Sequence, residues 1–101
     1  MRVYISGAIT NTPGYEENFD RAKNNLLNMG HEVINPAKVE NIATHKMTYE
    51  EYMTIDLVLL GLCDAIYMLQ GWQDSKGANR EYGYALGSGM KVLFEDETVL
   101  A

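Results

Sequence analysis

Glu81 is the first residue whose position suggests chemistry. It lies in the stretch GWQDSKGANREYGYALGSG, residues 71–89, just inside a helix that the pattern predicts over Gly77–Gly89. The positive end of a helix dipole favours an ionised carboxylate at such a position by about 0.3–1 kcal/mol. Two interpretations stay open: a solvated acid that only stabilises its helix, or an ionised carboxylate that faces a pocket and acts as a nucleophile.

Asp56 is the second such residue, because it interrupts an otherwise apolar stripe of a predicted helix. The other members of that stripe are Tyr49, Tyr52, Met53, Leu59, Leu60 and Cys63. A buried carboxylate is costly unless it is paired or hydrogen-bonded. Asp56 therefore either bonds a neighbouring loop from the edge of the stripe or faces a pocket, where it holds a ligand hydroxyl or a proton. Two carboxylates near one sugar are the groups that retaining glycosyl transfer uses.

The segment YISGAIT, residues 4–10, could bind a ligand through its backbone. A strand that ends at Ser6-Gly7 leaves N–H groups free for an anion or a hydroxyl, although a simple turn explains the residues equally well. The segment is neither a P-loop nor a GxGxxG motif. Tyr4 alternates with Val3 and Ile5, so we expect it on the opposite face of the sheet. Trp72 either stacks on a flat base or covers the core.

Other residue types that often carry chemistry have simpler interpretations. His31 and His45 lack a ligand partner at metal spacing, so we expect no metal site and no cofactor. Cys63 has no catalytic partner and is expected to be a small buried hydrophobe. Core or pocket wall is expected for Met47, Met53, Tyr49 and Tyr52.

The helices and strands that must position these residues are predicted from hydrophobic periodicity and from the Pro, Gly and capping residues at their ends. Strands are expected at Arg2–Ser6 and in the runs HEVINP, DAIYML and KVLF. A first helix starts at Thr12-Pro13, stops at Gly30 and carries an apolar stripe. That stripe consists of Tyr15, Phe19, Ala22, Leu26 and Met29. A weakly patterned loop after Pro36 leads to a capping box of Thr48 and Glu51, which opens the second helix.

The order βαβαβαβ predicts one α/β domain over residues 1–101. Its sheet should be parallel, with four to five strands, right-handed crossovers and helices on both faces. Ligands of open α/β sheets bind beyond the carboxyl ends of the strands. Those ends are Ser6-Gly7, Asn35-Pro36 and Gly71-Trp72, so the Glu81 segment lies at the expected functional edge.

Composition and charge exclude several classes of protein. The chain has 101 residues, 47% of them hydrophobic, which fits one globular domain. Its net charge is −6, part of it in a tail of Glu95, Asp96 and Glu97, and no Lys/Arg cluster suggests a binder of nucleic-acid polymers. No apolar run reaches the ~18 residues of a membrane helix. With no signal peptide and one cysteine, we expect a cytoplasmic protein.

The second helix also predicts self-association. It is apolar nearly all round from Ile55 to Leu62, and one face of a sheet cannot cover all of that surface. We therefore expect a homodimer or a higher homo-oligomer.

Taken together, three motifs resemble the nucleoside 2-deoxyribosyltransferase family, whose superfamily includes the 2′-deoxynucleoside 5′-phosphate N-hydrolases. They are YISG at the first strand, D…CD.I across the second helix and third strand, and S.GA..E.GYA at the third helix. NPA and CD.IY.L.GW are similar to a branch of small phage and bacterial proteins. The resemblance covers nearly the whole chain, and the flavodoxin-like α/β sandwich that it implies agrees with the predicted elements.

The resemblance implies roles for individual residues. Glu81 matches the nucleophilic Glu, Asp56 an Asp that contacts the sugar or assists proton transfer, and Tyr4 a Tyr beside the nucleophile. Ser75 falls where the hydrolases use a Ser and the transferases an acid. Candidate substrate-binding residues are Ser6, Gly7 and Ala8, which fall where the hydrolases bind a 5′-phosphate, together with Trp72, Ser75 and Gly77.

The chain also departs from the family pattern. The phosphate loop of the hydrolases is basic, whereas SGAITNT contains no Arg. The C-terminal segment with which the transferases complete a neighbouring subunit's site is not expected here. The leading hypothesis is an enzyme that cleaves or transfers the N-glycosidic bond of a small-molecule (deoxy)nucleoside or nucleotide through Glu81. The alternatives are a non-catalytic module that binds a nucleotide-like ligand on the same scaffold, and a structural or interaction protein.

Overall fold

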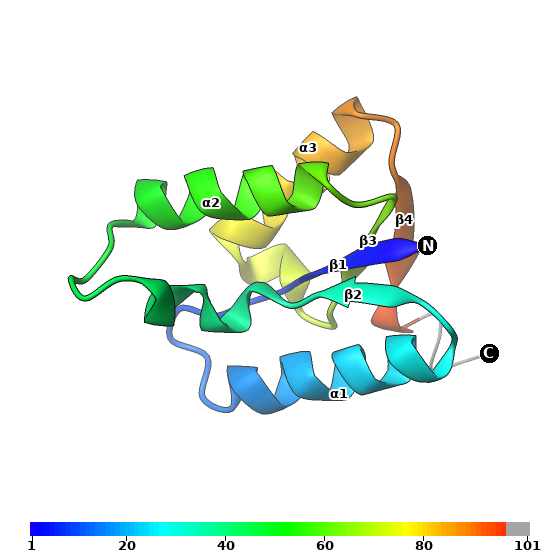
Figure 1. Ribbon diagram of the computed structural model, residues 1–101, viewed down its shortest axis with the longest axis horizontal. Coiled ribbons are helices and arrows are strands. Elements are labelled where there is room, and N and C mark those ends of the chain that lie inside the picture. Colours follow the sequence, from blue (N-terminus) through cyan, green and yellow to red (C-terminus); the bar gives the residue numbers. More distant parts are fainter. Residues whose placement is uncertain (97–101) are drawn as a thin grey trace.

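Four parallel strands form one sheet in the order β2-β1-β3-β4 (Figure 1). The computed structural model describes residues 1–96, apart from the side chains of residues 40 and 41, so Glu97 lies outside it. The strands are β1 (Arg2–Ser6), β2 (Glu32–Ile34), β3 (Ala65–Met68) and β4 (Lys91–Phe94). β1 and β3 are central, which fits their apolar sequences, because a strand covered on both faces does not alternate. The predicted parallel α/β sheet is confirmed, with four strands in the described residues.

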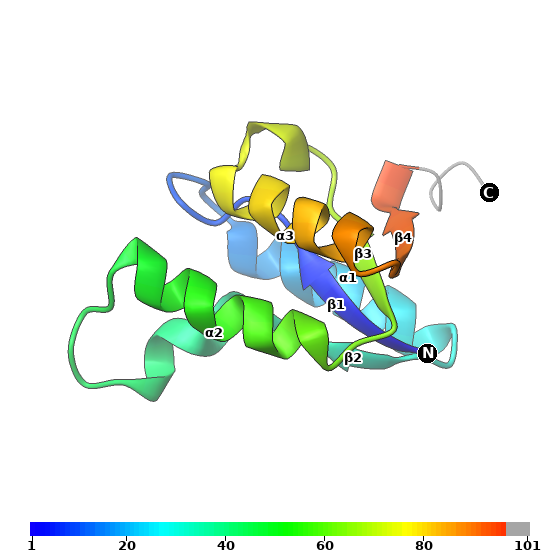
Figure 2. The same cartoon turned by 90° about the horizontal axis from the view of Figure 1, so that it is seen from above.

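Three helices cover the two faces of the sheet. α1 (Tyr15–Asn28) lies on one face, and α2 (Tyr49–Gly61) and α3 (Lys76–Gly87) lie side by side on the other (Figures 1 and 2). This is the three-layer sandwich that the alternating elements predicted. No helix in the described residues is long and apolar enough to cross a bilayer.

Three local predictions were wrong. α1 begins at Tyr15 and not at Thr12-Pro13, because residues 9–15 form successive turns that end at Gly14 in a left-handed conformation. Met29 is 57% exposed, since it caps the end of α1 instead of continuing its buried stripe. The segment after Pro36 is a 3₁₀-helix, η1 (Pro36–Ile42), which begins where the Asn35 side chain accepts a hydrogen bond from the Ala37 N–H at 3.0 Å. The predicted capping box of the second helix is confirmed.

Each face of the sheet has its own core. Alternation along β1 turns Val3 and Ile5 toward α1 and Tyr4 toward α2 and α3, as predicted. The core under α1 contains Val3, Ile5, Phe19, Ala22, Leu26, Ala37, Ala65, Tyr67 and Leu69. The core under α2 and α3 contains Tyr4, Leu60, Ile66, Met68, Ala78 and Ala85. The side chain of Tyr4, with its polar hydroxyl, thus lies in the core under α2 and α3.

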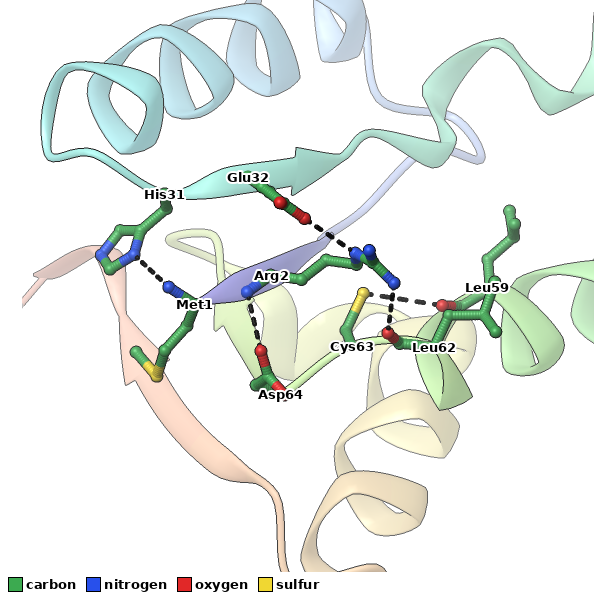
Figure 3. Close-up of polar contacts among 8 residues, drawn as sticks. All are labelled: Met1, Arg2, His31, Glu32, Leu59, Leu62, Cys63 and Asp64. Carbon is green, nitrogen blue, oxygen red and sulfur yellow. Dashed lines mark hydrogen bonds and ion pairs between the residues drawn. The ribbon is translucent and has the colours of Figure 1, made fainter.

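Arg2 joins the amino ends of the strands (Figure 3). Its backbone N–H donates to Asp64 at 2.9 Å, its Nε donates to Glu32 at 3.1 Å, and its Nη1 donates to the carbonyl oxygen of Leu62 at 3.1 Å. The pair with Glu32 is exposed, and such pairs contribute at most about 1 kcal/mol. These contacts therefore organise the amino edge of the sheet, opposite the edge where the strands end.

Candidate active site

A cavity of about 380 Å³ opens where the strands end, at the edge that the sequence predicted. Its walls come from β1 and the loop after it, from α1 and η1, and from the N-terminal parts of α2 and α3. The polar and charged residues that line it are Thr10, Lys46, Asp56, Ser75 and Glu81. The apolar, aromatic and glycine residues are Ile5, Gly7, Ile9, Tyr15, Phe19, Pro36, Ala37, Val39, Tyr49, Tyr52, Met53, Gly77 and Ala78. The lining is therefore mostly apolar, with two carboxylates and one cation.

Glu81 projects from α3 toward β1 and is only 5% exposed. The Tyr4 hydroxyl donates to its Oε2 at 2.5 Å, and the Ser6 hydroxyl donates to its Oε1 at 2.6 Å. α3 starts where it does because Ser75 caps it, accepting from the Ala78 N–H at 3.1 Å. Of the two interpretations of Glu81, the solvated helix acid is therefore excluded, since both carboxylate oxygens are fixed by strand residues inside the protein.

Asp56 reaches the same cavity from α2. Tyr49, Tyr52, Met53 and Asp56 recur at helical spacing, and all four line the cavity. Oδ1 of Asp56 is buried and has no hydrogen-bond partner within the described residues. Because an unpaired buried polar atom costs about 1–3 kcal/mol, this oxygen needs either a proton or a ligand donor. The structure thus favours the pocket interpretation of Asp56 over the bond to a loop.

The two carboxyl groups differ in their surroundings. Burial, followed by the negative charge of Glu81, raises the pKa of Asp56 to about 7. Burial also raises the pKa of Glu81, but its hydrogen bonds from Ser6 and Tyr4 oppose that effect. We assign the first charge to Glu81, because donors stabilise its anion and Asp56 has none. At neutral pH the pair then holds a carboxylate on α3 and, on α2, an acid that is protonated in about half of the molecules.

Tyr4 stays a hydrogen-bond donor in this arrangement. Its burial, and then the negative charge of Glu81, raise the pKa of the Tyr4 phenol well above its usual value. The hydroxyl is therefore protonated and holds Glu81 in position.

Gly7 shows why the end of β1 must be small. A Cβ atom at this position would lie 2.7 Å from Cδ1 and 2.9 Å from Cβ of Leu69, which is closer than such atoms approach. The glycine lets β1 and the end of β3 meet while its backbone lines the cavity.

Most of the predicted site residues meet at this cavity. Asp56, Glu81, Gly7, Ser75 and Gly77 line it, and Tyr4 and Ser6 contact Glu81. Ala8 follows Gly7 but is not among the lining residues.

Trp72 is not among the residues that line this cavity. Its ring centroid is 4.7 Å from that of Tyr82 and 6.3 Å from that of Phe94, and it covers the core under α3. Gly71 in a left-handed conformation precedes the 3₁₀ turn η2 (Trp72–Asp74), which carries the indole. The interpretation of Trp72 as a core cover is thus the one that the structure supports.

Sequence reasoning missed Lys46 and Val39 as lining residues, and it included Ile9 and Thr10 only in a segment whose backbone could bind a ligand. They lie in segments without helical or strand periodicity, so no pattern placed their side chains. Tyr49, Tyr52 and Met53 were expected as core or pocket wall and line the cavity.

The cysteine and metal predictions concern residues away from the cavity. Cys63 is half-buried against the second core, and burial raises the pKa of its thiol to about 11. The thiol is therefore neutral and unreactive. In residues 1–96 no group of three or more His, Cys, Asp and Glu side chains has the geometry of a metal site.

Comparison with known proteins gives the family. A model described as a domain of unknown function, DUF4406, matches residues 1–94. The chain belongs to the DUF4406 family. No protein with a curated description matches it.

Solved structures share the fold of this DUF4406 domain. A 2-deoxyribosyltransferase from Bacillus psychrosaccharolyticus is 18% identical, with a TM-score of 0.76, over 93% of this chain and 71% of that one. The CMP N-glycosidase BcmB from Clostridium botulinum is 21% identical, with a TM-score of 0.65, over 93% and 70%. A 2-desoxiribosyltransferase from Leishmania mexicana is 22% identical, with a TM-score of 0.69, over 92% and 62%. The resemblance that the motifs indicated is confirmed at the level of the fold.

Proposed function

We propose that this domain is an enzyme that cleaves or transfers the N-glycosidic bond of a small-molecule (deoxy)nucleoside or nucleotide, with Glu81 as the nucleophile. The observation that carries the proposal is the pair of acids in one cavity: Glu81 fixed by Tyr4 and Ser6, and Asp56 with an unpartnered buried oxygen. Two carboxyl groups in unlike surroundings suit acid and nucleophile roles at one sugar. The likeness to a deoxyribosyltransferase and an N-glycosidase supports the same chemistry.

The first half of the reaction uses both acids. A carboxylate oxygen of Glu81 attacks the anomeric carbon, and the bond from that carbon to the base nitrogen breaks. The electron pair of that bond goes to the base, which takes the proton of Asp56. The products are a glycosyl ester on Glu81, a free base and ionised Asp56. The negative charge of Glu81 also stabilises the oxocarbenium-like transition state.

The second half restores the site. Ionised Asp56 removes a proton from water, or from an N–H of an acceptor base, and that nucleophile attacks the anomeric carbon. The ester bond breaks and its electron pair returns to Glu81. Water gives hydrolysis, and an acceptor base gives transfer to a new nucleoside. Tyr4 and Ser6 keep Glu81 aligned in both steps. Each carboxylate oxygen of Glu81 accepts one hydrogen bond from them and keeps a further lone pair for the reaction.

A panel of nucleosides and nucleotides, with chromatography of the products, tests this proposal. Glu81→Gln is the key variant, because it removes the charge and the attacking oxygen but keeps the shape. We expect the wild type to release a base and this variant to lose at least about 10³-fold in kcat. Mass spectrometry of the quenched wild type should show a glycosyl adduct on Glu81.

Glu81→Gln must also be shown to fold. It keeps both hydroxyl partners within reach and removes a buried charge, so we expect a change in unfolding free energy of about 1 kcal/mol or less. Asp56→Asn is the comparison variant and should lower both rate and affinity. Wild-type turnover in a folded Glu81→Gln variant would refute the nucleophile. A ligand that binds tightly and is recovered unchanged would favour the binding module.

We also propose that the chain forms a homo-oligomer through the outer surface of α2. Ile55, Val58, Leu59 and Leu62 form an apolar stripe at helical spacing, with Val58 63% and Leu62 56% exposed. A second copy fits this stripe, because its centre carries no charge and two such stripes pack against each other across a two-fold axis.

A further inference from the structure

Along α2 the cavity has an inner and an outer end. Asp56 lies at the inner end beside the Glu81 carboxylate, and Tyr49 lies seven residues earlier, at the first turn of the helix. A rise of 1.5 Å per residue separates the two positions by roughly 10 Å along the helix axis. A substrate that reacts at the two acids therefore extends toward Tyr49 if it fills the cavity.

Positive charge gathers at the outer end. Lys76 Nζ lies 5.0 Å, and Arg80 Cζ 5.6 Å, from the centre of the Tyr49 ring. Lys46, three residues before Tyr49, lines the cavity itself. These are three of the eight Lys and Arg residues of a chain whose net charge is −6. These three cations share the outer end with Glu50 and Glu51 of the first turn of α2, while Asp56 and Glu81 lie at the inner end.

Lys46 differs from the other two cations in its lack of a charged or aromatic partner among residues 1–96. Arg80 donates to Glu50 at 2.9 Å and, like Lys76, faces the Tyr49 ring. Lys46 makes no ion pair or cation–π contact within the described residues, and it is the one charged donor on the cavity wall that a ligand could use. A neutral nucleoside would leave this ammonium group unused.

We propose that Lys46 binds a phosphate group of the substrate, so that the domain acts on a phosphorylated nucleoside in preference to the free nucleoside. This inference rests on the proposed function, which supplies the nucleoside. Phosphate is the anionic group that nucleosides carry, and an ammonium on a flexible stem meets it as a point charge without a fixed orientation. The ammonium compensates for the repulsion that the Glu81 carboxylate exerts on an anion. The loop SGAITNT, which lacks Arg, then needs no cation of its own.

The test compares a nucleoside 5′-monophosphate with the matching nucleoside on the wild type and on Lys46→Met, which keeps the apolar stem and removes the charge. We expect the wild type to prefer the nucleotide, and Lys46→Met to lower kcat/KM for the nucleotide about tenfold, mainly through KM. Its kcat/KM for the nucleoside should fall much less than that for the nucleotide, because the nucleoside offers no anionic group to the ammonium. Lys38→Met is the matched control, since Lys38 is exposed on η1 and does not line the cavity, and it should behave as the wild type.

Binding measurements separate this inference from the proposed function. Calorimetric titration of the same two ligands needs no turnover, so nucleotide binding that weakens in Lys46→Met upholds the phosphate contact even if no product forms. Equal preference in the wild type and Lys46→Met overturns it. Inorganic phosphate alone is the third ligand: if it binds through Lys46 as tightly as the nucleotide does, the residue serves a free anion and the inference fails.

Discussion

The Tyr4 hydroxyl and the Oε2 atom of Glu81 lie 2.5 Å apart, although 77 residues separate them in the sequence. The bond connects the middle of β1 to the second turn of α3. With the 2.6 Å bond from Ser6 it fixes both oxygens of Glu81, whereas Asp56 keeps an oxygen without a partner. This asymmetry is the reason for assigning the nucleophile to Glu81 and the proton to Asp56.

Tyr4→Phe should weaken catalysis through the position and the charge of Glu81. The variant keeps the ring in the core and removes the donated hydrogen bond, so we expect kcat/KM to fall roughly 10–100-fold. The pKa of Glu81 should rise, because its anion loses a donor, and the acidic limb of the rate profile should move to higher pH. Unfolding in urea should show a loss of about 1 kcal/mol.

Tyr84→Phe is the control for this change. Tyr84 is exposed on α3 and does not line the cavity, so loss of its hydroxyl should alter neither the rate nor the pH profile. If Tyr4→Phe were destabilised but kept the wild-type rate and acidic limb, Tyr4 would be a core residue only.

The dependence of kcat/KM on pH should be bell-shaped. In the proposed mechanism Glu81 must be ionised to attack, so the rate falls at low pH as it gains a proton. Asp56 must be protonated to serve the leaving base, and its pKa is about 7, so the rate falls as the pH rises above about 7. The two apparent values belong to the coupled pair, and rate measurements from about pH 4.5 to 9 would give both.

Asp56→Asn identifies the group behind the alkaline limb. An amide cannot transfer the proton, so the rate should fall and the limb near pH 7 should disappear, while the acidic limb remains. If the fall in rate above about pH 7 persisted in this variant, it would arise from another titrating group. A substrate with a good leaving group, which needs no proton, should recover much of the lost rate.

Local signals in the sequence predicted much of this fold. β1 and β4 have the bounds that their apolar runs indicated, and the Thr48–Glu51 capping box opens α2. The alternation of Val3, Tyr4 and Ile5 assigned each side chain to the correct face. Asp56 was identified because a carboxylate in an apolar helix stripe is costly unless it has a partner or a ligand. Each of these signals acts within one element, where periodicity and capping operate.

What the sequence left open depends on contacts between elements. The helix position of Glu81 suggests only a dipole interaction, and its burial results from Tyr4 and Ser6 on a strand far away in the chain. The direction of Trp72 is decided by Tyr82 and Phe94, which it meets only after α3 and β4 have packed. Lys46 lies in a segment without periodicity, so only the three-dimensional structure places it on the cavity wall.

Trp72→Leu tests which of the two interpretations of Trp72 holds. If the indole covers the core, the variant should lose about 1–3 kcal/mol of unfolding free energy, since it gives up packing against Tyr82 and Phe94. KM should stay within about twofold of the wild type, because Trp72 is not on the cavity wall. Urea unfolding and steady-state kinetics give the two numbers. A large rise in KM with unchanged stability would return Trp72 to the substrate site.

Val58→Glu should break the proposed oligomer. A carboxylate at the centre of the α2 stripe would be buried without a partner between two copies, which is strongly unfavourable. Light scattering at micromolar concentration should give a multiple of the 11.4 kDa chain mass for the wild type and the single-chain mass for the variant. Val58 is 63% exposed, so the fold of each copy should persist, with an unchanged circular dichroism spectrum. Asn24→Glu adds the same charge to an exposed position of α1, on the other face of the sheet, and should leave the assembly intact. A wild type that is monomeric under these conditions would contradict the interface.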